Sequence, residues 1–502
     1  MGRTPEPVEV SSFAGGMPVG SSWIERVNPA RTAELVGRAR AVDAAGGAAA
    51  VDAAHQAFLG WRGVPVDERV TLLLASADAV AATSEELGPL LARELGKVVA
   101  DCRGEMGFAA ACLRANAAST PRVTAPVEVD DDAGRLLVTQ EPFGVVVAIV
   151  PWNAPLILSI LKVAPAVATG NTVVVKPSPL APLAVTSALA AIASHLPPGV
   201  LNVVHGDGTV GESVVRHPWT RKVAFTGGNR TAELVARAAA TTVTPLVLEL
   251  GGNDPAIFLD DLEFTDDVME RAVFGTFLTS GQVCMAAKRL YVPRRRAAEF
   301  VEAYRAAADR VLVVGDPLED GVTMGPMVSA EQRQHVWSLV DDARDRGATV
   351  HPVGRVAMGT DLARGWYLRP TLVLGLHDDA PLVTQEQFGP AVPLLTYDDE
   401  HDVVTRANDC EFGLASSVWS ADEDRAVAMA GHLEAGMTFI NCHNRAGMSL
   451  RAPFGGVKRS GFGREFGDHG LAEYVQTHAI HAPASVRGTG TGVPATAYPG
   501  QT

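Results

Sequence analysis

The sequence predicts an α/β fold built around a parallel β-sheet. Three observations support this prediction. The chain has 502 residues, and at about 150 residues per domain it forms roughly three folding units. Its composition, 47% hydrophobic and 20% charged, is close to that of an ordinary soluble domain and supplies a large core. From residue 141 onward, short β-branched runs alternate with Ala/Leu-rich segments of helical length, which is typical of βαβ units.

The strands are predicted from apolar runs that end close to Gly, Pro or Asn. In a parallel sheet, ligands bind in loops at the carboxyl ends of the strands. Two of the intervening helices are expected at residues 183–195 and 231–240. The predicted strands are residues 145–150, 172–175, 201–204, 223–225, 246–248 and 256–259.

The segments before and after the predicted strands complete the expected sequence of helices, strands and tail. The first hundred or so residues read mainly as helices, at 69–95 and 101–118. The polar stretch 121–140, with alternating Val and Leu, is expected to leave the main body. A second α/β region follows residue 249, with a helix, a strand and a helix at 266–277, 289–292 and 296–311. Residues 483–502 are rich in Gly, Pro, Thr and Ser and are expected to be disordered.

One apolar stretch resembles a membrane span by hydropathy alone. Residues 143–168 are long enough to cross a bilayer, but they contain three prolines together with Asn153 and Lys162. We therefore predict a buried strand that feeds a buried helix. The N-terminus has no apolar signal region. A cytoplasmic protein without a membrane anchor is expected.

Composition excludes several classes of function. The net charge of −15 disfavours nucleic acid or anionic lipid as the main partner, because both require a basic face. The five cysteines form no CxxC pair, and the 13 histidines form no HExxH spacing, so neither a disulfide framework nor a metal site is predicted. Only six of the 42 basic residues are lysines, which makes each lysine a candidate for a compact point charge.

Cys284 is a candidate nucleophile. It lies in the run TSGQVCM (279–285), in which Gly281 would let the backbone bring a thiol close to a bound substrate. A thiolate is the strongest nucleophile among ordinary side chains. The alternative is a small buried hydrophobic residue, as many lone cysteines are.

Two polar residues at predicted strand ends would complement a nucleophile. Glu249 closes the strand at 246–248 ahead of a glycine pair, where a mobile carboxylate would activate water. Asn153 follows the strand at 145–150, and its amide would donate to a developing oxyanion without changing charge. Taken singly, Glu249 fits a solvent-facing position and Asn153 fits a turn.

Phosphate-binding features follow the same strands. Lys176 ends the strand at 172–175, where a cation suits ribose hydroxyls or phosphate. The run GDGTVG (206–211) matches G-x-G-x-x-G, but no acidic residue ends a strand about 20 positions later. Thr226, Gly227 and Gly228 precede a predicted helix and give a better pyrophosphate site through backbone N–H groups. Simple glycine turns are the alternative for both runs.

In this order, these motifs resemble the aldehyde dehydrogenase superfamily from about residue 27 to residue 474. The resemblance implies a Rossmann-type cofactor domain (1–119 and 141–250), an α/β catalytic domain (251–456) and a small β oligomerisation element (120–140 and 473–482) that builds dimers or tetramers. The matching segments are PWN (151–153), GNTVVVKPS (170–178), FTGG (225–228), LELGG (248–252), GQVC (281–284), EQFGP (386–390) and PFGGVKRSGFGRE (453–465).

The resemblance implies a catalytic role for four residues. Cys284 would attack an aldehyde, and its own N–H and the Asn153 amide would hold the oxyanion. Hydride transfer to NAD or NADP would leave a thioester, which water activated by Glu249 would release as a carboxylic acid. Glu465 matches an acidic residue credited with proton relay in parts of the family.

The resemblance also implies a cofactor site and leaves its preference open. Lys176 would bind the adenosine ribose and Glu386 the nicotinamide ribose. Pro179 stands where the family often has an acid that excludes a 2′-phosphate, and Gly228 replaces a frequent serine; NAD is slightly preferred over NADP. The full expected set is Trp152, Lys176, Ser178, Gly208, Thr226, Gly227, Gly228, Leu250, Glu386 and Phe388.

The substrate is expected to be bulky or apolar. Ala154 stands where the family commonly has an aromatic residue that lines the aldehyde tunnel. The other expected lining residues are apolar as well. Arg445 and Arg451 either meet an anionic substrate tail or are surface residues. The expected pocket comprises Ala154, Leu158, Leu161, Met285, Met448 and Phe454.

The same residues leave three alternative functions open. A cysteine-dependent ester hydrolase or acyl-transferase would use Cys284 and Asn153 but leave Lys176 and Glu386 without a role. A CoA-acylating relative would release the thioester with a thiol, whereas Glu249 favours water. A binding or structural protein would not need nucleophile, base and oxyanion donor together.

Overall fold

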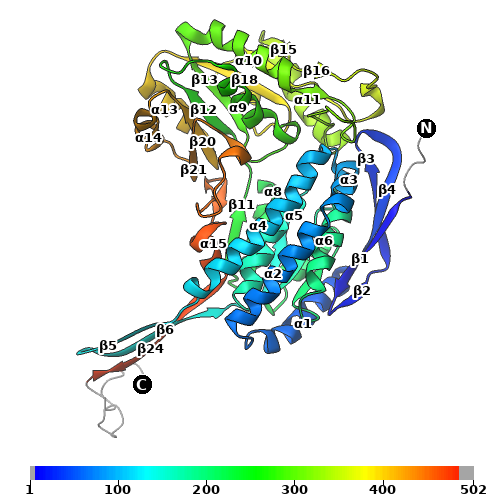
Figure 1. The fold of residues 1–502 in the computed structure, drawn as a ribbon, viewed down its shortest axis with the longest axis vertical. Coiled ribbons are helices and arrows are strands. Elements are labelled where there is room, and N and C mark those ends of the chain that lie inside the picture. The colour runs from blue at the N-terminus through cyan, green and yellow to red at the C-terminus, as the bar shows by residue number, and fades with distance from the viewer. Residues whose placement is uncertain (1–5, 485–502) are drawn as a thin grey trace.

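A computed structural model describes residues 6–484 and is shown in Figure 1. Its larger sheet has ten strands in the order β23-β11-β10-β7-β8-β9-β1-β4-β3, with β2 paired to β1. The central strands run parallel, as predicted. The bounds are β1 Val8–Ala14, β2 Met17–Val19, β3 Ser22–Asn28, β4 Arg31–Ala41, β7 Val145–Ile149, β8 Thr172–Lys176, β9 Leu201–Val203, β10 Thr220–Thr226, β11 Leu246–Glu249 and β23 Gly461–Phe462.

Helices cover both faces of this sheet. The strand β7 shows why its sequence is apolar throughout: Val145 and Val147 pack into one hydrophobic cluster, and Val146 and Ala148 into the opposite one. The first cluster contains α1, α7 and α8, and the second contains α2 to α6. Their bounds are α1 Ala44–Trp61, α2 Val66–Ala82, α3 Ser84–Leu95, α4 Val99–Val123, α5 Pro155–Ala168, α6 Leu183–Ala193, α7 Gly208–Val215 and α8 Asn229–Ala240.

A seven-stranded sheet forms the second α/β region. Its order is β15-β17-β18-β13-β12-β20-β21, and helices again pack on both of its faces. The bounds are β12 Asp254–Phe258, β13 Ala287–Pro293, β15 Thr349–Pro352, β17 Thr371–Leu374, β18 Ala391–Tyr397, β20 Ala415–Trp419, β21 Met437–Ile440, α9 Asp266–Phe277, α10 Ala297–Val311, α11 Ala330–Asp345, α12 Pro381–Thr384, α13 Glu400–Asn408 and α14 Glu423–Ala430. The short helix α15 Gly467–Ala472 packs instead into the core beside α4 and α5 of the larger sheet.

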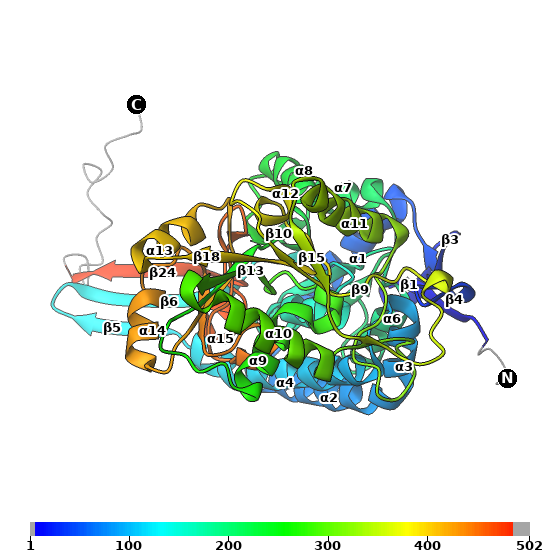
Figure 2. The same ribbon diagram turned by 90° about the horizontal axis from the view of Figure 1, so that it is seen from above.

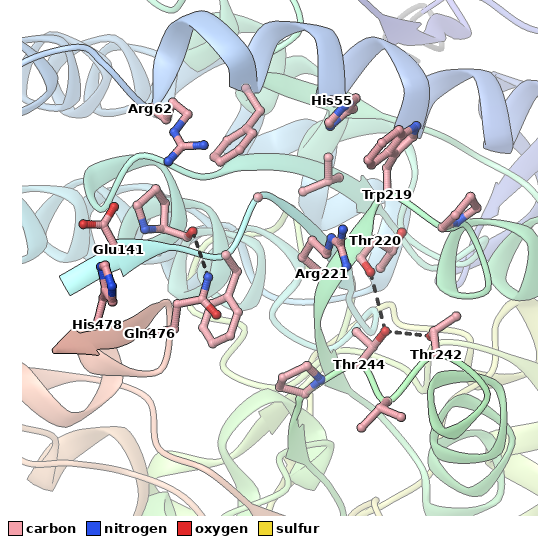
Figure 3. A pocket seen from close by; sticks show the side chains of 18 of the residues that line it. His55, Arg62, Glu141, Trp219, Thr220, Arg221, Thr242, Thr244, Gln476 and His478 are labelled. Atoms are coloured by element: carbon pink, nitrogen blue, oxygen red, sulfur yellow. Dashed lines mark hydrogen bonds between the residues drawn. The ribbon is translucent and has the colours of Figure 1, made fainter. Parts of the chain in front are cut away.

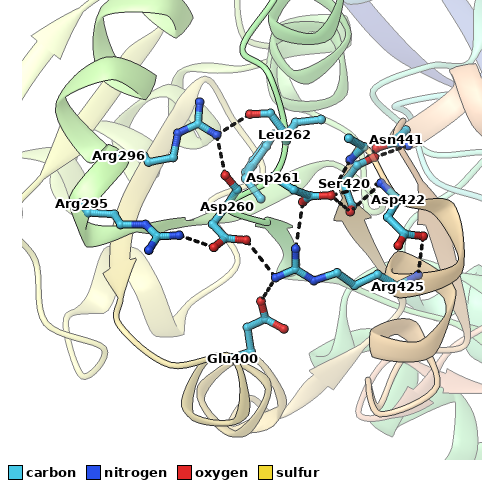
Figure 4. Close-up of polar contacts among 12 residues, drawn as sticks. Asp260, Asp261, Leu262, Arg295, Arg296, Glu400, Ser420, Asp422, Arg425 and Asn441 are labelled. Carbon is cyan, nitrogen blue, oxygen red and sulfur yellow. Dashed lines mark hydrogen bonds and ion pairs between the residues drawn. The ribbon is translucent and has the colours of Figure 1, made fainter.

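An ion-pair network fastens the outer helices of this region (Figure 4). The Arg425 guanidinium on α14 contacts Asp260 at 2.9 Å and Asp261 at 3.2 Å, both just after β12. It also pairs with Glu400 on α13. Asp260 also accepts from Arg295. One guanidinium therefore joins two helices to the end of a central strand.

A three-stranded antiparallel sheet extends away from the rest of the molecule (Figures 1 and 2). It consists of β5 Val127–Asp131, β6 Gly134–Pro142 and β24 Val475–Pro483, in the order β24-β6-β5. These strands lie in the segments expected to leave the main body. Pro483, the first residue of the predicted tail at 483–502, ends β24 instead, and residues 485–502 of that tail lie outside the described residues.

The structure corrects three sequence-based predictions. Residues 8–41 form the strands β1 to β4, not the helical layer expected of the first hundred residues. The single helix expected at 69–95 is two helices, α2 and α3, which meet at Thr83. Residues 120–123 belong to α4 rather than to an extended strand.

The apolar stretch at 143–168 has the predicted form, because β7 leads into the buried helix α5. Among residues 6–484, no helix is long and apolar enough to cross a membrane. Two small strand pairs complete the fold: β14 Val313–Val314 with β16 Arg355–Val356, and β19 Phe412–Gly413 with β22 Val457–Lys458.

Candidate active site

Four predicted site residues lie at one edge of the ten-stranded sheet. Asn153 follows β7, Lys176 ends β8, Thr226 ends β10 and Glu249 ends β11. These strands are mutually parallel, so their carboxyl ends meet at the same edge. This is the edge at which open α/β sheets bind their ligands.

The loop that carries Cys284 has an unusual backbone. Thr279, Ser280 and Gly281 are all left-handed, with φ of 54°, 58° and 68°, a conformation that costs about 1–3 kcal/mol at each non-glycine residue. A Cβ on Gly281 would lie 2.4 Å from the carbonyl oxygen of Gly389. Only glycine at this position lets the Cys284 loop rest against the EQFGP segment.

A cavity of about 290 Å³ brings most of the candidate residues together. Cys284 and Asn153 both line it, and so do Gln332 and His335 of α11, which the sequence analysis did not single out. No local motif marks these two side chains. Seven of the expected cofactor residues also line the cavity: Trp152, Thr226, Gly227, Gly228, Leu250, Glu386 and Phe388.

The Asn153 amide faces the cysteine loop. Its Nδ2 donates to the carbonyl oxygen of Gln282 at 3.2 Å, two residues before Cys284. Burial raises the pKa of the Cys284 thiol, and the neighbouring Glu386, Asp254 and Glu249 raise it further. The thiol is therefore protonated at neutral pH, and a nucleophilic attack requires a base to remove its proton.

Glu249 lies just outside the cavity lining with a buried, unpaired oxygen. Its Oε1 accepts no hydrogen bond. Burial raises the pKa of Glu249 well above its usual value, the charge of Glu465 adds to the increase, and Lys162 and Arg464 oppose it. A carboxyl group with a raised pKa at this edge is suited to exchange protons near neutral pH.

Lys162 is a site residue that the sequence analysis missed. Its buried Nζ donates to Glu465 Oε1 at 2.6 Å and to Thr226 Oγ1 at 2.7 Å. The sequence feature that could have identified Lys162 is the presence of a lysine inside the apolar stretch 143–168. The rarity of lysine is informative across the chain, because five of the six lysines are buried: Lys97, Lys162, Lys176, Lys222 and Lys288.

The two loops across the cavity are held in contact. Glu386 accepts from the backbone N–H of Gly252 at 3.0 Å, and burial raises the pKa of Glu386 to about 7. The rings of Trp152 and Phe388 meet edge to face, with centroids 5.4 Å apart. A half-buried carboxylate beside an aromatic pair suits recognition of sugar hydroxyls next to a planar ring.

The groups around the cavity fit a dinucleotide. The helix α8 begins after Gly228 without any side-chain cap, and a Cβ on Gly228 would contact nothing within 4 Å. Its first N–H groups are therefore open to a pyrophosphate. Lys176 is buried, and burial lowers its pKa to about 8 while Asp207 opposes the decrease.

Three expected cofactor residues lie outside the cavity lining. Lys176 ends β8, Ser178 lies two residues beyond it, and Gly208 begins α7. A Cβ on Gly211 of α7 would lie 3.7 Å from the Lys176 side chain, so Lys176 and the start of α7 are neighbours. They extend the candidate site along the sheet edge.

The expected substrate residues also lie outside this cavity. Ala154 precedes α5, and Leu158 and Leu161 lie on α5 and pack into the adjoining core. Phe454 forms a β-bridge with Glu465. The remaining two residues of the set are the half-buried Met285 and Met448.

The two arginines near the expected substrate loop differ in their surroundings. Arg445 pairs with Asp101 at 2.9 Å, which neutralises its charge. Arg451 is exposed. An anionic substrate tail therefore gains no support from Arg445.

A larger cavity of about 930 Å³ lies at the opposite, amino-terminal ends of β7 and β10 (Figure 3). His55, Arg62, Trp219 and Arg221 are among its lining residues. It contains none of the residues predicted for catalysis or cofactor binding. Size alone therefore does not identify the functional site, and the smaller cavity at the carboxyl ends has the relevant chemistry.

Comparisons with known proteins find relatives along nearly the whole chain. The model of the aldehyde dehydrogenase family matches residues 18–480. The chain is 38% identical over 490 residues to 2-hydroxymuconic semialdehyde dehydrogenase of Pseudomonas sp. (strain CF600), covering 94% of this chain and 99% of that protein. It is 36% identical to geranial dehydrogenase of Castellaniella defragrans, covering 93% and 98%. The crystal structure of Staphylococcus aureus betaine aldehyde dehydrogenase with NAD⁺ is 30% identical, with a TM-score of 0.89 and 94% of each chain covered.

Proposed function

The chain belongs to the aldehyde dehydrogenase family and is an NAD(P)-dependent aldehyde-oxidising enzyme, and we propose that it acts through a thioester on Cys284. One observation gives the main support for this proposal. Cys284 and the Asn153 amide line the same cavity as the uncapped start of α8 and the half-buried carboxylate of Glu386. A nucleophile, an oxyanion donor and the contacts for a dinucleotide are thus within one space.

In the first half-reaction, Cys284 loses its proton to Glu249, and its sulfur forms a bond to the aldehyde carbon. The carbonyl electrons move to the oxygen, which accepts hydrogen bonds from the Asn153 amide and from the backbone N–H of Cys284. Bound NAD(P) supplies the acceptor for the hydride that leaves the same carbon. Collapse of the oxyanion then gives a thioester.

Glu249 first releases to solvent the proton that it took from Cys284. In the second half-reaction, the ionised Glu249 removes a proton from water, and the hydroxide attacks the thioester carbon. The carbon–sulfur bond breaks, the carboxylic acid leaves and Cys284 regains a proton. Glu465 and Lys162 form the route by which Glu249 exchanges protons, because Glu465 raises the pKa of Glu249 and its own charge is paired by Lys162 at 2.6 Å. Glu249 supports release by water rather than by CoA.

NAD is the proposed cofactor, with NADP as the alternative. The N–H groups at the start of α8 would bind the pyrophosphate, Glu386 the nicotinamide ribose and Lys176 the adenosine ribose. The related betaine aldehyde dehydrogenase binds NAD⁺. Pro179 gives no carboxylate to exclude a 2′-phosphate, so the preference for NAD is expected to be modest.

The proposed substrate is a bulky or apolar aldehyde. Ala154 contributes only a methyl group just before α5, and the neighbouring Leu158 and Leu161 are apolar. The pairing of Arg445 with Asp101 removes one cation that would favour an anionic tail. Geranial, the substrate in the name of one relative, belongs to the proposed class.

The experiment crosses a panel of aldehydes with NAD and NADP and follows absorbance at 340 nm, with Cys284→Ala as the blank. We expect NADH formation without added CoA, and a higher kcat/KM for benzaldehyde-like and medium-chain aldehydes than for acetaldehyde. A dependence on CoA would indicate the acylating type. Ester hydrolysis without any reduction of NAD or NADP would indicate a hydrolase instead.

A further inference from the structure

A buried ion pair lies directly behind the turn that carries Asn153. Lys97 follows Gly96, whose left-handed backbone (φ 79°) ends α3, and Glu105 lies on α4. The two side chains are 5% and 0% exposed, and Lys97 Nζ donates to the Glu105 carboxylate. Neither residue lines the cavity, so neither is placed to touch substrate or cofactor there.

The pair holds the turn on both sides of Asn153. Lys97 Nζ donates to the main-chain oxygen of Asn153 at 3.0 Å. Glu105 Oε1 accepts from the N–H groups of Leu156 at 2.8 Å and Ile157 at 3.4 Å. The helix α5 has no side-chain cap at its own start. Glu105 therefore supplies from α4 the acceptor that these N–H groups need.

The Asn153 side chain points away from this pair toward the cysteine loop, where its Nδ2 donates to Gln282 O at 3.2 Å. Lys97 thus holds the main chain of Asn153, while the Asn153 side-chain amide faces the cysteine loop. Placement matters because an error of about 1 Å in a catalytic group costs up to about 100-fold in rate.

The charges make this arrangement rigid. Burial is the largest single influence and lowers the pKa of Lys97, but the charge and hydrogen bond of Glu105, together with Cys102 and Asp101, outweigh it and raise the pKa. Lys97 is therefore cationic at working pH. Removing either partner leaves the other buried without its counter-charge, so the two side chains stay together.

We infer that Lys97 and Glu105 are positioning residues for the oxyanion donor: they fix the backbone of Asn153 so that its amide meets the oxyanion of the reacting carbonyl. The inference rests on the proposed function, in which Asn153 is that donor. It adds two residues that act on the reaction through the backbone around Asn153.

A double-mutant cycle between Lys97→Met and Asn153→Ala tests the inference. Two rates are measured per titrated Cys284 thiol: aldehyde oxidation, and hydrolysis of a p-nitrophenyl ester, which needs the oxyanion donor but no dinucleotide. Lys97→Met is expected to lower both rates at least about tenfold in the wild-type background and less than about twofold in the Asn153→Ala background. The KM for NAD should not change.

Arg93→Met is the matched control, because Arg93 on α3 forms an ion pair with Glu34 at 2.8 Å in which both side chains are only 8% exposed. It is expected to lower the Tm but to leave both rates unchanged. If Lys97→Met does not fold, Glu105→Gln takes its place in the cycle, since it retains an acceptor for the Leu156 N–H.

The inference is overturned if Lys97→Met lowers the rates by the same factor with and without Asn153→Ala. It is also overturned if Arg93→Met lowers the rates as much as Lys97→Met does. A wild-type enzyme that oxidises no aldehyde would instead contradict the proposed function. In that case the ester-hydrolysis cycle still decides whether Lys97 acts through Asn153.

Discussion

Glu249 must lose a proton before it acts as a base, and its surroundings oppose that loss. Burial raises its pKa, and the adjacent charge of Glu465 raises it further. The fraction of ionised Glu249 therefore rises at a higher pH than for an ordinary glutamate, whose pKa is about 4.3. The kcat of the enzyme should rise with pH through the raised pKa of this group.

Glu465→Gln is predicted to move the acid limb of kcat to lower pH. The substitution removes a negative neighbour of Glu249 and leaves the Lys162 cation to stabilise the Glu249 anion, and both changes lower the pKa of Glu249. The measurement is a pH–rate profile of both enzymes. The pH of the acid limb decides the outcome, even if the substitution also changes the maximal kcat.

Glu212→Gln is the control, since Glu212 is an exposed glutamate paired with Arg216. It should leave the acid limb in place. An acid limb that stays in place or moves to higher pH in Glu465→Gln would show that Glu249 does not set it.

Local sequence signals located the candidate residues but not their partners. Cys284, Glu249 and Asn153 are each marked by a neighbouring glycine or a strand end. Lys162 meets Glu465 across 303 positions, and Lys97 meets the Asn153 backbone across 56. Contacts of this separation depend on the packing of distant elements, which no local pattern encodes.

At the scale of elements, the start of α8 is the phosphate-binding feature of the proposed site. Gly228→Asp is predicted to raise the KM for NAD at least about tenfold, because a carboxylate would occupy and repel the pyrophosphate position. The fold should tolerate the change: a Cβ at this position meets nothing within 4 Å, and aspartate is a favourable N-cap.

Gly228→Asn is the matched variant, because it has the same shape and caps the helix without a charge. Its KM for NAD should lie between those of the wild type and Gly228→Asp, close to the former. Equal KM values for the two variants would place the pyrophosphate elsewhere. Steady-state kinetics and a Tm for each variant complete the comparison.

Element prediction succeeded where periodicity was strong and failed at the N-terminus. Residues 266–277 form the predicted helix α9 with the predicted bounds. Residues 31–41, RTAELVGRARA, are rich in Arg, Ala, Leu and Glu, which favour helices, yet they form β4. Pairing with β3 and β1 overrides that propensity, and both pairings are tertiary contacts.

At the scale of the whole molecule, the sheet β24-β6-β5 leaves apolar side chains exposed within residues 6–484. The strand β5 is exposed along its entire length, and Val127 and Val129 are 57% and 42% exposed. Such a small sheet is marginal unless something covers one of its faces. We propose that a second copy of this chain covers it.

Light scattering is therefore predicted to give a mass of two or four times 52.6 kDa at micromolar concentration. Val127→Asp combined with Val129→Asp should reduce that mass, because both charges would have to be buried on assembly. Met358→Asp, at a fully exposed residue on another surface, is the control and should not change it. A wild-type monomer under these conditions would contradict the proposal.

The central claim, that the reaction passes through sulfur at position 284, is tested most directly by mass spectrometry of enzyme quenched during turnover. Glu249→Gln slows release by water, so the acyl group should accumulate. With an aldehyde and NAD, peptide mapping should locate the added acyl mass on Cys284 and on no other residue. Acyl mass on another side chain, or none while NADH is still formed, would contradict the mechanism.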